Sequence, residues 1–566
     1  MITCRLSFPN PLTHLLHIDL KFQINTQASL DLILPAWRPG RYELASFVEN
    51  IQRFSVMDEN GSSLKWHKTR PNIWRVATNQ TKEITVSYQY YANKMDAGNS
   101  VLDDHQIYIN FINCIFYTHL HQTEEINLVI DIPANYKVSC SLPNPTLGVY
   151  QAANYQQLVD APLLASPDLK TLNYEAGGCL FTIAILGACP LTDDEIITDF
   201  KKFSESQITA MGSAPTQQYD FIIQSLDYPH YHGVEHQNAT VLVLGPNDES
   251  QHAAYYEKLM GVASHELFHA WNVTRIRPTE LSPYQFDIET MTDTGFVTEG
   301  FTTYYGDLFL KQSGVFTQDE YFKEINTLLK RHFENYGRFE STLIQSSQNL
   351  WVDGYKNIFP SKKVSIYVKG ALCALILDLT IRKNTKHEAH LIEVIKRLYA
   401  NHTYNKGGYS QADVYRILQE VGGQDLQSLL ASLYESTTSL EPLLQKALDF
   451  VGCTLISQPH PITLTSKFGI RCQGAAISEI APGSSAEEKL SVGDEILRWN
   501  GEAFHSEKAN VLVSNFVRIK RGARLLDINL EPNDKSYFSS YEIAIKTQAS
   551  DEQLKNLSLW LSNNQK

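Results

Sequence analysis

The sequence predicts a multidomain α+β protein with a β-rich N-terminal part, a mainly helical middle and a β-rich C-terminal part. Its 566 residues exceed what one hydrophobic core organises, since single cores stop growing near ~250–300 residues. Alternating apolar residues, then helical periodicity, then glycine-punctuated β patterns follow one another along the chain. We expect an N-terminal β-sandwich over 1–170, a mainly helical domain over 171–450, a third domain over 451–548 and a tail over 549–566.

Short alternating runs dominate the first part of the chain. His17–Ile24, Ser29–Leu34 and Glu83–Tyr90 are clear examples, in which apolar and polar side chains take turns. A strand with one buried face has this period of two, and the Pro, Asn and Gly clusters between the runs are typical of turns. The pattern predicts an all-β sandwich.

Helical periodicity with recognisable ends marks the middle of the chain. Four helices are expected: from Asp248 or Ser250 past His269 until Pro278, from Thr292 and Asp293 to near Gly314, from the capping box Thr317–Glu320 to about Phe333, and from Val364 to Arg382. Further helices are expected within 387–450. Near the C-terminus, Leu557, Trp560 and Leu561 indicate a short helix or a loose tail.

The charge balance and the apolar pattern exclude some classes of partner. Lysine and arginine total 48 against 62 acidic residues, and a net charge of −14 argues against nucleic acid. The longest apolar run, Ala371–Ile381, is well short of the ~20 residues that cross a bilayer, so no membrane association is expected. No secretory signal is visible, and eight cysteines without a Cys-x-x-Cys pair suit free thiols. We expect a cytoplasmic protein.

The segment His265-Glu-Leu-Phe-His269 carries the strongest chemical signal. In a helix, positions four apart lie on one face, so His265 and His269 can direct two imidazole nitrogens at one ion while Glu266 lies beside it. This arrangement is typical of a zinc site in which the glutamate is the general base of a hydrolase. We therefore predict one zinc ion per chain, held in part by the two histidines.

A catalytic zinc site requires a third ligand from a separate element. The downstream candidates are Glu280, Asp287, Glu289, Asp293 and Glu299, and spacing alone does not select among them. Glu289 lies twenty residues after His269, an interval that resembles thermolysin-like enzymes. Glu299 lies in Gly295–Tyr305, which is expected to form a helix packed against the first, and we choose it as the third ligand.

His265–Pro278, followed by Thr298–Tyr305, resembles the glycyl aminopeptidase family, PDZ-containing relatives of the thermolysin-like and aminopeptidase N-type zinc enzymes of the gluzincin superfamily. The resemblance implies a β domain, a thermolysin-like catalytic domain and a PDZ domain in this order. It also implies a zinc aminopeptidase that removes small N-terminal residues, glycine or alanine, from peptides. Leu34–Tyr42 resembles the family's N-terminal domain too, although its direct interpretation is a turn-rich loop between strands.

Two further segments resemble the same superfamily. Gly233-Val-Glu-His236 is similar to the Gly-x-Met-Glu-Asn signature of aminopeptidase N-type enzymes, which implies that Glu235 receives the substrate's α-ammonium group. The chain departs from that signature at Val234 and His236. Tyr367 precedes Lys369-Gly370 as in the superfamily's Tyr-x-Lys-Gly stretch, which implies that its hydroxyl stabilises the tetrahedral intermediate.

Three histidines near Glu235 lack a compact ligand pattern. His230, His232 and His236 are two to four residues apart on a segment that is not helical, and we do not expect a second metal site there.

The C-terminal part resembles a PDZ domain of bacterial proteases in three stretches: Phe468–Arg471, Ile480–Ala486 and Leu490–Gly501. Such a domain implies a bound peptide or C-terminus as a partner, or a purely structural role in packing on the catalytic unit. Two alternatives to the aminopeptidase stay open on the sequence: a zinc endopeptidase, and a non-catalytic PDZ scaffold on a peptidase fold.

Overall fold

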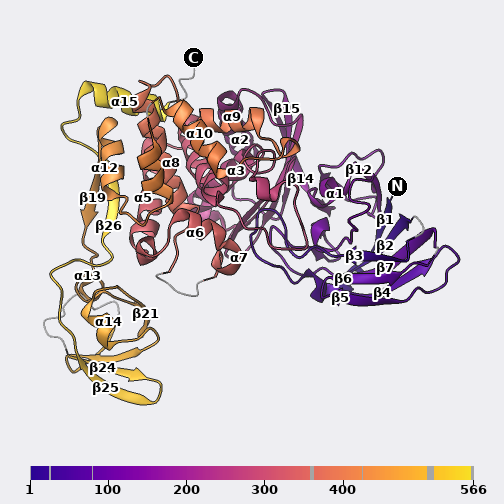
Figure 1. Cartoon of the computed structure of the whole chain (residues 1–566), viewed down its shortest axis with the longest axis horizontal. Helices are drawn as coiled ribbons and strands as arrows, with labels where there is room; N and C mark the ends of the chain where they lie inside the picture. The colour runs from indigo at the N-terminus through magenta and orange to yellow at the C-terminus, as the bar shows by residue number, and fades with distance from the viewer. Residues whose placement is uncertain are drawn as a thin grey trace.

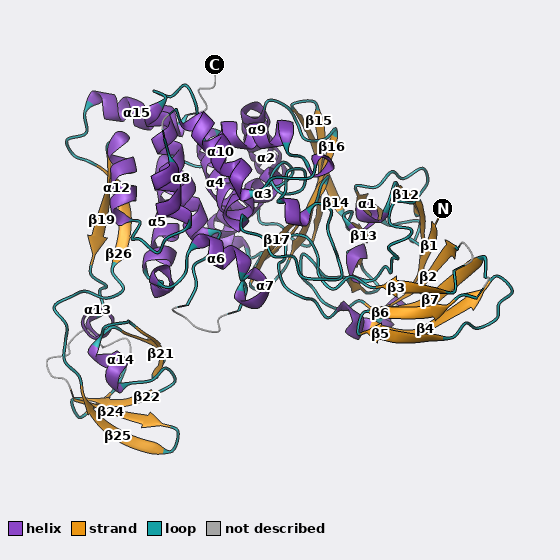
Figure 2. Cartoon of the chain, in the orientation of Figure 1, coloured by secondary structure: helices purple, strands orange, loops and turns teal. Residues whose placement is uncertain are grey.

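The computed structural model describes residues 2–24, 27–79, 81–356, 362–423, 425–505 and 516–562 of the chain. A β-rich N-terminal domain lies at one end, a helical body in the middle, and a small β-rich module at the other end (Figure 1, Figure 2). The multidomain α+β architecture expected from the sequence is therefore observed. Within the described residues, no helix combines the length and the apolar character needed to cross a membrane.

Three sheets form the N-terminal domain, with strand orders β12-β10-β1-β2-β7-β4, β11-β13-β9-β8 and β3-β6-β5. A single buried cluster takes side chains from all three, for example Ile18, Leu32 and Ile109. The elements are β1 (Ile2–Ser7), β2 (Leu15–Gln23), β3 (Ser29–Ile33), β4 (Ile51–Asp58), β5 (Trp66–Arg70), β6 (Ile73–Ala77), β7 (Glu83–Tyr91), β8 (Val101–Leu102), β9 (Ile107–Ile109), β10 (Ile126–Ile130), β11 (Lys137–Cys140), β12 (Val149–Ala152), α1 (Tyr155–Val159) and β13 (Leu163–Ser166).

A five-stranded sheet connects this domain to the helical body. Its order is β14 (Lys170–Ala176), β15 (Cys179–Leu186), β16 (Gln218–Ser225), β18 (Ala239–Gly245) and β17 (His230–Glu235), which leaves β17 at an edge. On one face Phe221 and Leu242 pack in a cluster with Leu267 of a helix, and on the other Val234 packs with Ala97 and Tyr108 of the N-terminal domain. The edge strand β17 therefore lies between the two domains.

The helices of the body form a layered bundle against that sheet (Figure 2). They are α2 (Asp193–Met211), α3 (His252–Phe268), α4 (Thr302–Gln312), α5 (Gln318–Phe333), α6 (Leu343–Gln348), α7 (Leu350–Asp353), α8 (Val368–Asn384), α9 (Ile392–Asn401), α10 (Gln411–Gly422), α11 (Gln427–Tyr434) and α12 (Glu441–Phe450). The predicted capping box at Thr317 and Glu320 is present at the start of α5.

Three helix boundaries differ from the predictions. Helix α3 ends at Phe268, well before Pro278. The His269 carbonyl is shared by the backbone N–H groups of Val273 and Thr274 and by the Thr274 hydroxyl, while Arg275 donates to the Ala270 carbonyl at 2.7 Å. The second helix is divided into a π-helical segment, Phe296–Phe301, and α4. Helix α8 begins at Val368 instead of Val364.

The C-terminal module has its own small core, which includes Phe468, Ile496 and Val517. Its elements are α13 (Thr463–Phe468), β20 (Ile470–Gln473), β21 (Ala476–Ile480), α14 (Ser485–Lys489), β22 (Glu495–Trp499), β23 (Glu502–Ala503), β24 (Phe516–Arg521) and β25 (Arg524–Asn529). Before and after the module run β19 (Cys453–Gln458) and β26 (Ser540–Ile545), which pair antiparallel along the helical body.

The last described residues return to the helical body as helix α15 (Asp551–Leu561), which packs against α4 and α12 (Figure 1). Trp560 is fully buried, and its indole Nε1–H donates to the Tyr304 hydroxyl at 3.0 Å. Of the two interpretations left open for this segment, the structure shows the helix.

Removing the Trp560 side chain should destabilise the helical body. A large cavity and the loss of the hydrogen bond that Tyr304 accepts should lower the free energy of unfolding of Trp560→Ala by about 3–5 kcal/mol, although the Tyr304 hydroxyl still donates to Asp378 at 2.7 Å. Leu554→Ala on the exposed side of the same helix should change it by less than about 0.5 kcal/mol, since Leu554 is 43% exposed. Urea unfolding followed by far-ultraviolet circular dichroism checks both. Equal, small effects would show that α15 contributes little stability.

Candidate active site

Helix α3 carries His265 into the centre of the molecule, and His269 follows directly after its last residue. Gln207 of α2 donates to the Ser264 carbonyl at 2.8 Å, and the Ser264 hydroxyl donates to the Gly306 carbonyl of α4 at 2.7 Å. A methyl group on Gly306 would lie 3.0 Å from the His265 Cα, so glycine lets α4 approach closely. Held in this way, the Nε2 atoms of His265 and His269 lie 3.0 Å apart.

A backbone carbonyl orients the imidazole of His269. Its Nδ1–H donates to the Asn272 carbonyl at 2.6 Å, and because a carbonyl can only accept, Nε2 is the nitrogen that faces the site. Burial opposes protonation of His269, yet the nearby carboxylate of Glu299 raises its pKa to about 10. Burial, reinforced by His269, lowers the pKa of His265 well below its usual value, so His265 is neutral and has a free lone pair.

Glu299 lies on the π-helical segment and faces both histidines. Its Oε2 is 3.4 Å from Nε2 of His269 and 3.9 Å from Nε2 of His265. The segment is held by Asn272, whose amide donates to the Val297 carbonyl at 2.8 Å. A methyl group on Gly300 would lie 2.6 Å from the Gly370 Cα, so the segment touches the start of α8. One potential ligand atom from each of His265, His269 and Glu299 lies within 4.8 Å of the others.

The other acidic candidates lie elsewhere. Asp287 accepts from the Tyr117 hydroxyl at 3.1 Å, and Asp293 accepts from the Gln348 amide at 2.7 Å. Glu280 and Glu289 are exposed. In the part of the chain that the structure describes, none of the four belongs to a group of three potential metal ligands.

Glu266 lies beside these ligands with an unsatisfied carboxylate. Its Oε2 is buried without a hydrogen-bond partner among the described residues, and Oε1 faces Gly233 of β17 so closely that a methyl group there would lie 2.3 Å away. Burial raises the pKa of Glu266 to about 8, against the opposing effect of His269 and with a further rise from Glu235. A nearby cation would favour the charged carboxylate, so the donor set fits a divalent metal.

Glu235 ends β17 on the same side as Glu266. Ligand atoms of Glu235, Glu266 and His269 lie within 4.8 Å of one another, and Glu235 is 5% exposed. Its Oε1 has no hydrogen-bond partner among the described residues, and burial raises its pKa. Gly40 of the N-terminal domain packs directly on it: a methyl group on Gly40 would lie 2.3 Å from Oε2.

Tyr367 immediately precedes α8 and lines the same space. Its hydroxyl lies 3.4 Å from that of Tyr355. Burial, together with Glu299, raises the pKa of Tyr367 well above its usual value, so the hydroxyl keeps its proton and can donate.

A single cleft of about 520 Å³ contains all six predicted site residues: Glu235, His265, Glu266, His269, Glu299 and Tyr367. Gly40, Arg41 and Tyr355 line it as well. The first two come from the Leu34–Tyr42 loop, which the direct interpretation of the sequence treated as a turn between strands. Tyr42 of the same loop donates to Glu299 at 3.3 Å. The Trp-Arg-Pro-Gly turn is the sequence feature that marks this loop, but nothing in the turn indicates that the loop contacts the site.

Two segments of the chain match known family domains. Residues 3–167 match the Peptidase M61 N-terminal domain, and residues 258–373 match the M61 glycyl aminopeptidase domain. The chain belongs to the M61 glycyl aminopeptidase family. As an M61 protein it is a zinc metallopeptidase, a hydrolase of the aminopeptidase class. The second matched segment contains five of the six site residues, while Glu235 lies between the two segments.

One solved structure agrees with this assignment at the level of the fold. The crystal structure of an aminopeptidase N family protein from Idiomarina loihiensis superposes with a TM-score of 0.88 at 25% identity, over 99% of this chain and 100% of that one. An M1 zinc metallopeptidase from Deinococcus radiodurans matches with a TM-score of 0.47 at 13% identity, over 77% of this M61 chain and 94% of that one. No curated protein sequence matches the chain.

The third ligand can be identified by zinc content. Glu299→Ala should lose most bound zinc, because loss of a direct ligand should lower the affinity by more than the 10- to 100-fold that is typical for loss of a group that only orients a ligand. Glu289→Ala, a matched change on an exposed glutamate, should keep one zinc per chain. Inductively coupled plasma mass spectrometry after dialysis measures both. Zinc retained by the first variant and lost by the second would reverse the assignment.

Proposed function

We propose that the protein removes small N-terminal residues, glycine or alanine, from peptides, with one zinc ion held by His265, His269 and Glu299. The observation that carries the proposal is the buried Glu235 carboxylate, whose Oε1 lacks a hydrogen-bond partner among the described residues. A buried carboxylate needs a compensating positive charge. A free α-ammonium group placed there would supply it and would align the first peptide bond with Glu266 and the metal ligands.

Glu266 is the proposed general base and acid. Zinc in this site supplies Lewis acidity, which polarises the scissile carbonyl and makes water a better nucleophile at neutral pH. The Glu266 carboxylate takes a proton from the attacking water and later delivers it to the leaving amine nitrogen. Its position favours this role, since its carboxylate shares the cleft with both histidines and its Oε2 finds no hydrogen-bond partner in the part of the chain that the structure describes.

Tyr367 is the proposed oxyanion donor. The carbonyl oxygen of the substrate gains negative charge as water attacks, and a phenol hydroxyl beside it donates a hydrogen bond that strengthens in the transition state. The raised pKa of Tyr367, caused chiefly by burial, keeps this hydrogen in place.

The edge of β17 is the proposed seat for the substrate backbone. Among the described strands β17 pairs only with β18, and Tyr231, Gly233 and Glu235 line the cleft. An extended peptide can add to such an edge through main-chain hydrogen bonds. With its amine at Glu235, the peptide would run along β17 past the general base.

We propose that residues 451–548 form a PDZ-like domain, whose partner would be a peptide or a protein C-terminus. In support, the module has a separate core, and its Arg471 forms an ion pair of 2.7 Å with Glu334 at the end of α5. Helix α5 also lines the cleft through Glu324 and Arg331. A purely structural role for the module fits these contacts too.

Comparing free with N-acetylated glycyl anilides tests the function. The wild type should cleave the free amine far better than the N-acetylated one, and Glu266→Gln should lower kcat by about 10²–10⁴-fold while zinc stays bound. Glu235→Gln should raise KM for the free amine about tenfold or more, because a charge-assisted hydrogen bond is lost. Equal cleavage of both substrates would favour the endopeptidase, and zinc without any cleavage would favour the scaffold.

Gly233→Ala tests whether the general base requires its close seat on β17. The added methyl group would meet Glu266 Oε1 at 2.3 Å and displace the carboxylate, so kcat should fall about 100-fold with zinc content unchanged. Gly261→Ala is the matched control, because Gly261 also lines the cleft but nothing lies within 4 Å of its added methyl group. Its kcat should stay within about twofold of the wild type. Similar activities of the two variants would contradict the proposed role of Glu266.

A further inference from the structure

The histidines around Glu235 belong to none of the groups of potential metal ligands found among the described residues. The positions of His232 on β17 and of His236 immediately after it explain these two histidines in another way. Successive side chains of a strand point to opposite faces, and Gly233 and Glu235 face the cleft. Val234 points the other way and packs with Ala97 and Tyr108 of the N-terminal domain.

Two aspartates of the N-terminal domain bind the histidines on either side of this contact. Asp96 pairs with Nδ1 of His232, three residues before Glu235. Asp160 pairs with Nδ1 of His236, one residue after Glu235, at 3.1 Å. The N-terminal domain therefore holds the end of the edge strand by a histidine–carboxylate contact on each side of Val234.

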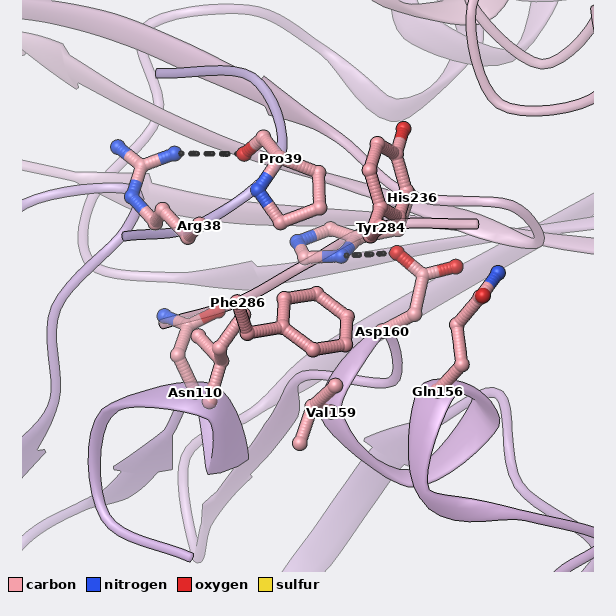
Figure 3. A pocket seen from close by; sticks show the side chains of 10 residues that line it. Arg38, Pro39, Asn110, Gln156, Val159, Asp160, His236, Tyr284 and Phe286 are labelled. Atoms are coloured by element: carbon pink, nitrogen blue, oxygen red, sulfur yellow. Dashed lines mark hydrogen bonds and ion pairs between the residues drawn. The ribbon is translucent and has the colours of Figure 1, made fainter. Parts of the chain in front are cut away.

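The second pair is the more buried of the two. His236 is 6% exposed, and Figure 3 shows its ring and the Asp160 carboxylate meeting beside a small pocket that Pro39, Tyr284 and Phe286 also line. The other oxygen of Asp160 accepts from the Gln237 backbone N–H at 2.9 Å. One carboxylate thus fixes both the side chain and the main chain immediately after Glu235.

The catalytic body holds the same turn from the opposite side. Arg275, which follows α3, donates to the Gln237 carbonyl at 2.6 Å and to the Asn238 side chain at 2.8 Å. The turn after Glu235 is consequently fixed between the N-terminal domain and the segment that follows the metal-ligating helix.

We propose that Asp160, through His236 and Gln237, is a positioning residue for Glu235 and thereby sets the selectivity for a free N-terminal amine. The inference rests on the proposed role of Glu235. Gly40 closes on one carboxylate oxygen of Glu235, so the carboxylate has little room to adjust if the strand end moves. A misplacement of about 1 Å at a reacting geometry costs on the order of 100-fold in rate, so a shift of this turn should weaken amine recognition before it affects the metal ligands.

Asp160→Ala tests the proposal with the full-length, zinc-loaded protein. We expect kcat/KM for a glycyl anilide to fall about tenfold or more because KM rises, while zinc content stays at the wild-type level. The ratio of kcat/KM for the free anilide to kcat/KM for the N-acetylated anilide should become smaller. Hydrogen–deuterium exchange of residues 230–239 should become faster. A general loss of folded protein would lower kcat/KM for both substrates equally and leave the ratio of the two values unchanged.

Asp168→Ala is the matched control. Asp168 is an exposed aspartate of the N-terminal domain, 3.6 Å from the exposed His105, and its loss should change neither the ratio nor the exchange. If Asp160→Ala does not fold, Asp160→Asn, which keeps one accepting oxygen, replaces it in the comparison. A wild type that cleaves the free and the N-acetylated anilide equally well would overturn the proposed function and this inference together. A selective wild type with an equally selective Asp160 variant would overturn this inference alone.

Discussion

Three carboxylates and two imidazoles share one buried space, and this crowding of charge is the constraint on which the rest of the structure depends. Glu235, Glu266 and Glu299 are each no more than 6% exposed. Like charges in a low-dielectric interior raise one another's energy, so such a group persists only where a cation compensates it and where the scaffold resists its spreading apart. A zinc ion and a substrate ammonium would together supply the positive charge.

The scaffold resists that spreading through close backbone contacts. Gly40 lies against Glu235, Gly233 against Glu266 and Gly306 against His265, and at each of them a methyl group would come within about 3.0 Å of its neighbour. These glycines come from the N-terminal domain, the edge strand and α4. Because each contact involves a different region of the chain, the site forms only when both domains have folded and docked.

The sequence predicted those parts of the site and fold that depend on local spacing. The His265-to-His269 interval and the capping box at Thr317 are short-range patterns, and alternation revealed the β-rich N-terminal domain. The contact of Gly40 with Glu235 was not predictable, since nearly two hundred residues separate them and only the docking of two domains brings them together. The early end of α3 was missed because Thr274 and Arg275 donate side-chain hydrogen bonds to the carbonyls of His269 and Ala270, just after the helix, and hydrophobic periodicity does not register such contacts.

The pairing of β19 with β26 makes the C-terminal module an insertion into a hairpin, although it is near the end of the chain. Gln458 and Ser540 are direct partners in that hairpin, so the chain leaves and re-enters the body at neighbouring points. Two adjacent attachments, together with the ion pair of Arg471 with Glu334, hold the module to the helical body more firmly than a single linker would. The pairing of β19 with β26 does not depend on the module, because a tight turn of a few residues could join the two strands at the same point. Exchange of such a module would leave the pairing of β19 with β26 in place and would change only the contacts that the module makes with the body, such as the ion pair of Arg471 with Glu334.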